Sequence, residues 1–228
     1  MLTVSAQWIV PVSGPPIRNG CISIDRGRVH AVSADAPGDA ASLGHVAVLP
    51  ALVNAHTHLE LSFLRGRVPP SDNFNDWVTT LMSMRRREAP DPNAPKIRDA
   101  AREAIANARA SGTGLVGDVS NTLVTVDLLR EAPMPGHVFY EQLGFNLADV
   151  PGKIAQARAA MSAVNGANDS VHLSLAAHAP YSVSPALFAA IRHEVNAQPH
   201  PVTTVHLGES AQEIEFLRSG TGPARVML

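Results

Sequence analysis

Residues 46–58 read Val-Ala-Val-Leu-Pro-Ala-Leu-Val-Asn-Ala-His-Thr-His, and this stretch decides the fold class. It is an apolar run, typical of a strand, that ends in two histidines. Residues two apart in a strand point to the same face, about 7 Å apart along the strand. The imidazoles of His56 and His58 can therefore converge on one metal ion, at the strand end where parallel α/β barrels carry their active sites. Taken alone, the tripeptide also fits a strand that happens to carry two histidines, one of them capping a loop.

Two later segments repeat this design. Residues 175–182 read Leu-Ala-Ala-His-Ala-Pro-Tyr-Ser, and residues 202–210 read Val-Thr-Thr-Val-His-Leu-Gly-Glu-Ser. In each, a histidine (His178 or His206) stands where an apolar or β-branched run gives way to a loop. A lone histidine there is more often hydrogen-bonded than catalytic. Three such sites in the same structural context favour a metal centre at one face of a barrel.

Composition narrows the class of protein. The 228 residues are 45% hydrophobic and 17% charged, as in a globular protein, and the net charge of −2 gives no electrostatic case for nucleic acid or an anionic membrane. The single cysteine, Cys21, excludes an internal disulfide and a thiolate cluster. The first residues lack the basic and apolar regions of a signal peptide, and no stretch approaches a membrane-spanning length, so we expect a cytoplasmic protein.

The pattern of predicted secondary structure changes near residue 50. Residues 1–50 contain three β-rich segments separated by turns, at 7–12, 21–25 and 28–33. From residue 51 onward, strand-like and helix-like patterns alternate, which predicts a parallel sheet. After the first strand, the further strands are expected at 113–118, 137–143, 171–177 and 202–207. The helices are expected at 74–88, 94–110, 124–131, 151–164, 185–196 and 211–219.

These motifs resemble the amidohydrolase superfamily, in particular its cytosine deaminase, S-adenosylhomocysteine deaminase and chlorohydrolase branch. The stretches that carry the resemblance are residues 49–58, Arg65-Gly66, 178–181 and 206–209, and Glu60 and Ser62 are similar to the aminofutalosine deaminase group. The resemblance implies a metal-dependent (β/α)8 TIM-type barrel. About the first five strands would lie in residues 51–228, and residues 1–50 would form part of a β-sandwich domain.

The metal ligands that the motifs favour are His56, His58 and His206. They would hold one divalent ion, zinc or iron, because neutral imidazole suits both. Dinuclear relatives use a carboxylated lysine after the fourth strand. Both lysines of this chain, Lys96 and Lys153, fall in predicted helices, which argues for a single ion.

The resemblance implies that Glu209 shuttles a proton and that His178 contacts the substrate. Glu141, at the end of the third strand, is a weaker candidate for a substrate contact. Each has an alternative: Glu209 could favour the N-terminus of the next helix, His178 could be a core histidine, and Glu141 could bond a loop. Asp118 and Asn121 present the same choice as Glu141.

The implied reaction is deamination of a purine, pyrimidine or nucleoside-like ring, in which metal-bound hydroxide attacks and Glu209 relays the proton. The alternatives are hydrolysis of another C–N or C–Cl bond, or a catalytically inactive fragment. Family members also use a histidine after the sixth strand and an aspartate after the eighth, which have no counterpart here, so we expect the first part of a longer enzyme. A small heterocycle is the expected partner, without nucleic acid or membrane, and open sheet edges predict self-association or a homo-oligomer.

Overall fold

Short strands separated by turns begin the computed structural model, which describes residues 1–88, 91–166, 170–223 and 225. The chain divides into two units, Met1–Leu52 and Val53–Leu228. The first holds a four-stranded sheet of order β5-β4-β1-β6 and a three-stranded sheet of order β3-β2-β7. Their bounds are β1 Leu2–Ser5, β2 Trp8–Ile9, β3 Ile17–Arg18, β4 Cys21–Asp25, β5 Arg28–Ser33, β6 Ala41–Ser42 and β7 Ala47–Val48.

The strands predicted at 21–25 and 28–33 are confirmed as β4 and β5. The turn between them places Arg26 and Gly27 at φ 47° and 76°, and glycine adopts this left-handed conformation without steric cost. The strand predicted at 7–12 is shorter, since β2 covers only Trp8–Ile9. Pro11 has no N–H to continue the pairing, and Val12 has a positive φ of 66°.

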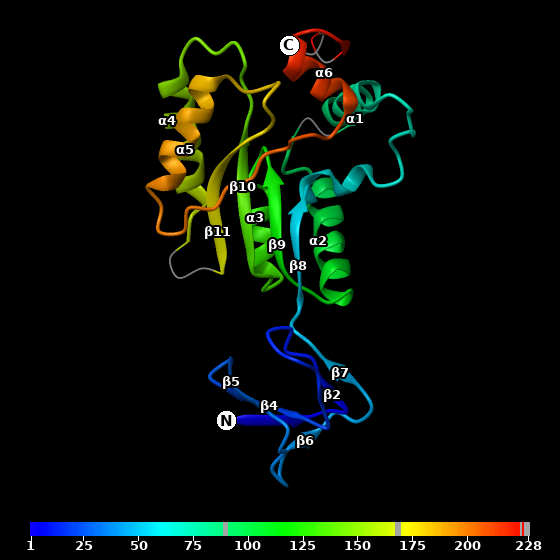
Figure 1. Ribbon diagram of the computed structural model, residues 1–228. Helices are drawn as coiled ribbons and strands as arrows, with labels where there is room; N and C mark the ends of the chain where they lie inside the picture. The colour runs from blue at the N-terminus through cyan, green and yellow to red at the C-terminus, as the bar shows by residue number, and fades with distance from the viewer. Residues whose placement is uncertain (89–90, 167–169, 224, 226–228) are drawn as a thin grey trace. The chain divides into compact units, whose positions relative to one another are not determined.

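A parallel sheet of order β8-β9-β10-β11 organises the second unit (Figure 1). Its strands are β8 Leu52–Thr57, β9 Thr113–Ser120, β10 Gly136–Gln142 and β11 Val171–Ala177. The helices between and after them are the 3-10 helix η1 Leu59–Leu64, α1 Phe74–Glu88, α2 Pro95–Ala110, α3 Thr125–Glu131, α4 Val150–Val164, α5 Pro185–Asn196 and α6 Ala211–Ser219. The predicted alternation of strands and helices is therefore confirmed from β8 to α6, with one exception described below.

Strand alternation separates the two faces of this sheet. One set of side chains, with Val116, Val138 and Leu175 among them, packs in hydrophobic clusters against α2, α3, α4 and α5. The opposite set includes Phe139 and Ala176, which pack together. The second face also carries Glu141 and, just beyond β11, His178. Helices α2 to α5 thus cover one face, and the candidate site lies on the other.

Local capping sets where several helices begin. Asp149, Ser184 and Ser210 cap α4, α5 and α6, each accepting a backbone N–H three residues later. Proline in the first turn of α4 and α5 needs no hydrogen-bond acceptor there. Among the described residues, no helix combines the length and the apolar character needed to cross a membrane.

The segment 202–207, predicted as the fifth strand, is not a strand. Two hydrogen bonds hold it beside β11: the Thr203 hydroxyl donates to Leu175 O at 2.8 Å, and the His206 N–H donates to His178 O at 2.8 Å. The first of these uses a side chain where a strand would use a backbone N–H, so no regular ladder forms. The second still places His206 at the site.

Candidate metal centre and substrate cavity

His56, His58 and His206 lie together at the carboxyl end of the parallel sheet. One ligand nitrogen from each lies within 4.8 Å of the other two. The ring centroids are 5.1 Å apart for His56–His58, 4.8 Å for His56–His206 and 5.3 Å for His58–His206. The structure thus brings together the three residues predicted as ligands, two from the end of β8 and one from the edge segment beside β11.

Hydrogen bonds of His206 indicate which of its nitrogens is free. Nδ1 lies 3.0 Å from His178 O, and because a carbonyl only accepts, Nδ1 carries the proton. The bare Nε2 then lies 3.2 Å from Nε2 of His58. Two imidazole nitrogens on a tetrahedral Zn²⁺ would be about 3.3 Å apart, given Zn–N bonds of about 2.05 Å. The His58–His206 pair therefore has the spacing of two ligands on a tetrahedral cation.

Burial favours the neutral form of His56 and His58, which is the form that binds a metal. Desolvation lowers the pKa of His58 to about 4, with further lowering by the nearby His206 and His56. The pKa of His178 also falls to about 4, mainly from burial and then from His206. Burial lowers the pKa of His56, and the nearby Glu209 opposes that shift.

Asp118 supports the turn that follows the histidine pair. It is fully buried in β9, and its carboxylate accepts the Leu59 N–H at 2.8 Å and the hydroxyls of Thr57 at 3.0 Å and Thr125 at 2.7 Å. Burial raises the pKa of Asp118 to about 7, while these hydrogen bonds oppose the shift. Of the two roles considered from the sequence, these bonds match the second, in which Asp118 bonds a loop.

A second group, Glu141, His178 and His206, also has ligand atoms within 4.8 Å of one another. Glu141 Oε1 lies 3.4 Å from His206 Nδ1, the nitrogen that already donates to His178 O. His178 Nδ1 lies 2.6 Å from the Ser182 hydroxyl, which itself donates to Ala179 O and so accepts from His178. The first group is therefore the better cation site, and His178 keeps Nε2 free as an acceptor.

Glu209 stands just before the last helix, between Gly208 (φ 74°) and the N-cap Ser210. Its backbone N–H donates to Glu213 Oε2 at 2.8 Å, and Glu213 is 1% exposed. Glu213, rather than Glu209, occupies the first turn of α6. Sequence reasoning missed Glu213, although the Ser-x-x-Glu spacing of a capping box was present to indicate it.

A cavity of about 510 Å³ contains all six predicted site residues. Helix α1 lines it with a largely apolar set of side chains: Phe74, Trp77, Val78, Leu81, Met82 and Arg85. The amphipathic pattern of residues 74–88 predicts Trp77 as a core residue, but in the structure Trp77 lines this cavity. An apolar cavity with a few convergent polar groups is the usual form of a small-molecule site.

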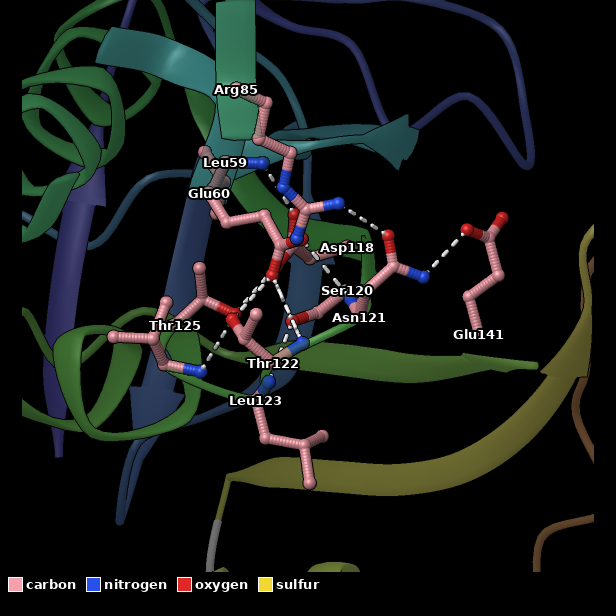
Figure 2. Close-up of polar contacts among 11 residues, drawn as sticks. Leu59, Glu60, Arg85, Asp118, Ser120, Asn121, Thr122, Leu123, Thr125 and Glu141 are labelled. Carbon is pink, nitrogen blue, oxygen red and sulfur yellow. Dashed lines mark hydrogen bonds and ion pairs between the residues drawn. The ribbon is translucent and has the colours of Figure 1, made fainter. Parts of the chain in front are cut away.

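Three arginines, Arg85 to Arg87, lie in the last turn of α1, a pattern that predicts a solvated helix end. The side chain of Arg85 is instead only 20% exposed and forms a 2.7 Å ion pair with Glu60, which is 4% exposed. Figure 2 shows this pair within a network of buried polar groups. The sequence carried no local signal for the pair, because its members are 25 residues apart.

Comparisons with known proteins show which family and which structures the chain is similar to. The sequence model of the amidohydrolase family matches residues 47–226. A Helicobacter pylori protein named adenosine deaminase is 29% identical over 180 residues, which are 77% of this chain and 41% of that protein. The crystal structure of Helicobacter pylori aminofutalosine deaminase with methylthio-coformycin superposes with a TM-score of 0.87 at 22% identity, covering 100% of this chain and 56% of that one.

Atrazine chlorohydrolase from Arthrobacter aurescens, solved with zinc, has a TM-score of 0.77 at 16% identity, covering 99% of this chain and 57% of that one. The chain thus spans roughly half the length of the proteins it resembles. These structural likenesses show the fold, which is part of a (β/α) barrel. Because the family model covers most of the sequence, the chain belongs to the amidohydrolase family.

Proposed function

We propose that the chain acts in metal-dependent hydrolytic deamination of a purine, pyrimidine or nucleoside-like ring. The observation that carries the proposal is the convergence of His56, His58 and His206 beside a cavity that also holds Glu209. The relatives named as deaminases, one of them solved with methylthio-coformycin, support a nucleoside-like substrate.

His56, His58 and His206 would hold the ion. The zinc in the related chlorohydrolase structure favours zinc over iron. When bound at such a site, zinc lowers the pKa of a water ligand towards about 7 and so supplies a nucleophile at neutral pH. Each histidine would present a lone pair to the ion, and the lowered pKa values of His56 and His58 support their neutral form.

Glu209 would accept the proton of the attacking water on a carboxylate oxygen and return it to the leaving amine. Glu209 is exposed and lines the cavity, while its backbone N–H is held by Glu213. The free Nε2 of His178 would accept a hydrogen bond from a ring N–H or an exocyclic amine. Glu141 Oε1 is buried without a hydrogen-bond partner among the described residues, and it would accept a further substrate donor.

A second candidate is hydrolysis of another C–N or a C–Cl bond at the same site, which the likeness to atrazine chlorohydrolase favours. The ligands and Glu209 would serve either leaving group. We further propose that residues 1–50 are part of a β-sandwich domain and that residues 51–228 are part of the barrel. The exposed Leu52 and Val53 of β8 support self-association through the sheet edge. The cytoplasmic compartment stays a prediction.

Metal content tests the proposal directly. Elemental analysis of the purified chain should give close to one zinc per chain. His56→Ala should remove most of the metal, whereas Glu209→Ala should keep it and abolish ammonia release from an adenosine-type substrate. His193→Ala, an exposed histidine on α5, is the matched control and should keep both. Full metal content in His56→Ala, or ammonia release by Glu209→Ala at the unaltered rate, would contradict the assignments.

A further inference from the structure

A series of buried hydrogen bonds connects helix α1 to the candidate site (Figure 2). It starts at Arg85, whose guanidinium contacts two partners at once. Nη2 donates to Glu60 Oε1 at 2.7 Å, and Nη1 donates to Asn121 Oδ1 at 3.1 Å. A planar guanidinium that binds two acceptors is held in one orientation, which a lysine could not reproduce.

Glu60 binds the guanidinium of Arg85 at the start of this series of contacts. Its carboxylate also accepts the Ser120 hydroxyl at 2.7 Å, the Thr122 hydroxyl at 2.6 Å, and the backbone N–H groups of Asn121 and Thr122 at 3.2 Å each. The carboxylate thus fixes both Arg85 and the loop that follows β9. A charge with this many partners costs little to keep buried, and it makes the local geometry rigid.

Asn121 carries the contact onward to Glu141. Its Nδ2 donates to Glu141 Oε2 at 2.8 Å, while its Oδ1 accepts from Arg85. Arginine can only donate and an ionised carboxylate can only accept, so just one orientation of the Asn121 amide satisfies both neighbours. Without Arg85 the amide would be free to rotate, and the hold on Glu141 would be lost.

Glu141 is left with one fixed oxygen and one open oxygen. Oε2 is held by Asn121, whereas Oε1 is buried, has no hydrogen-bond partner among the described residues, and lies 3.4 Å from His206 Nδ1. A carboxylate behind a histidine orients the ring and increases its basicity as a ligand. The position of Oε1 therefore affects His206 on one side and the cavity on the other.

From these contacts we infer that Arg85 and Asn121 are positioning residues, which hold the Glu141 carboxylate beside His206 and the substrate cavity. The expected effect on zinc affinity rests on the proposed metal centre. The positioning of Glu141 by Arg85 and Asn121 does not. The inference assigns a role in the site to α1, a helix that lies outside the predicted histidine motifs. A network that merely stabilised the fold would weaken zinc binding by the same factor whether or not Glu141 is present.

Metal affinity measures the consequence. Arg85→Met and Asn121→Leu each remove one link of this hydrogen-bond series while keeping a side chain of similar size. We expect zinc affinity, measured by competition with a chromophoric chelator, to fall about tenfold in each, the lower end of the range for partners of metal ligands. Arg67→Met is the matched control, because it removes the 2.6 Å ion pair with Glu88, also on α1, without touching Asn121. It should keep zinc affinity within about twofold.

A double variant tests whether the effect passes through Glu141. In a Glu141→Leu background, Asn121→Leu should weaken zinc binding by less than about twofold, because the group it positions is already gone. Equal losses in both backgrounds, or an Arg67→Met loss as large as that of Arg85→Met, would overturn the inference in favour of a general stabilising role.

The geometry can be read without any metal. In a crystal structure of the metal-free Asn121→Leu chain, the separation between Glu141 Oε1 and His206 Nδ1 should depart from 3.4 Å. An unmoved Glu141 would refute the positioning role even if zinc affinity changed. Conversely, an unaltered chain that takes up no zinc would refute the proposed metal centre, while this structural comparison would still decide the role of Arg85 and Asn121.

Discussion

Replacing Asp118 with asparagine should remove a pH dependence of stability that the buried carboxylate creates. Burial raises the pKa of Asp118 from 3.8 to about 7 in the folded chain. The folded state therefore holds a proton on Asp118 between these two values, where the unfolded state has released it. The stabilisation is full below pH 4 and is lost as pH rises through 7. Asp118→Asn is neutral at every pH and should lack this dependence.

The magnitude follows from the two pKa values. A shift from 3.8 to about 7 corresponds to about 4 kcal/mol over the full pH range, at 1.36 kcal/mol for each pKa unit. Between pH 5 and pH 8, the linkage relation gives a loss of about 2.5 kcal/mol in the free energy of unfolding. The lowered pKa values of His58 and His178 act in the opposite direction, because protonation of these groups as pH falls favours unfolding. They are common to both proteins and cancel in the comparison.

Urea unfolding at pH 5 and pH 8, with a chelator present, measures this difference. Because the chain has only two tryptophans, a Trp8→Phe background makes the fluorescence report on Trp77 in the second unit. Asp72→Asn, at an exposed position, serves as the control and should behave like the unaltered chain. If Asp118→Asn and the unaltered chain lose the same stability between the two pH values, the reasoning from the burial of Asp118 is wrong.

Three further outcomes follow from the structure. Zinc at 100 times its Kd should raise the free energy of unfolding by about 2.7 kcal/mol. Zinc binding should weaken in acid, because the histidines must be neutral to bind the ion. Thermal denaturation with and without zinc at pH 5.5 and 7.5 would check both outcomes. Ser210→Ala should cost about 1 kcal/mol by removing the cap of α6, measured by urea unfolding, and an unchanged stability would contradict the capping role. Gly117→Ala should destabilise the second unit by about 3 kcal/mol or prevent its folding, because a Cβ atom would overlap the Ala55 carbonyl oxygen; a stability equal to that of the unaltered chain would show that β8 and β9 can separate freely.

Most secondary structure was predictable because it depends on local signals. The helices at 74–88, 185–196 and 211–219 and the strand at 171–177 have the predicted bounds. Ser184 and Ser210 mark the starts of two of these helices, and Gly220 marks the end of one. The exception, 202–207, has the composition of a strand. Whether a β-branched segment forms a ladder depends on its neighbour, and here Thr203 bonds β11 through its side chain.

In the candidate site too, some features were predictable from the sequence and others were not. The common position of three histidines after strand-like runs indicated that they would meet, and the structure brings them together, while their role as ligands stays a prediction. The contact of Arg85 with Glu60 was not predictable, because an arginine at a helix end is most often solvated. Nor could the sequence show that Trp77 faces a cavity rather than a core.

The sequence alone therefore determined the order of the elements and the edge of the sheet at which the chemistry would gather. Both follow from short-range rules: the periods of strands and helices, and the shared direction of parallel strands. Only the tertiary structure decided which nitrogen of His206 is free, which carboxylates are buried, and how α1 reaches Glu141 through Arg85 and Asn121. These features depend on distances between residues far apart in the chain, which are set by packing and hydrogen bonding in the folded state.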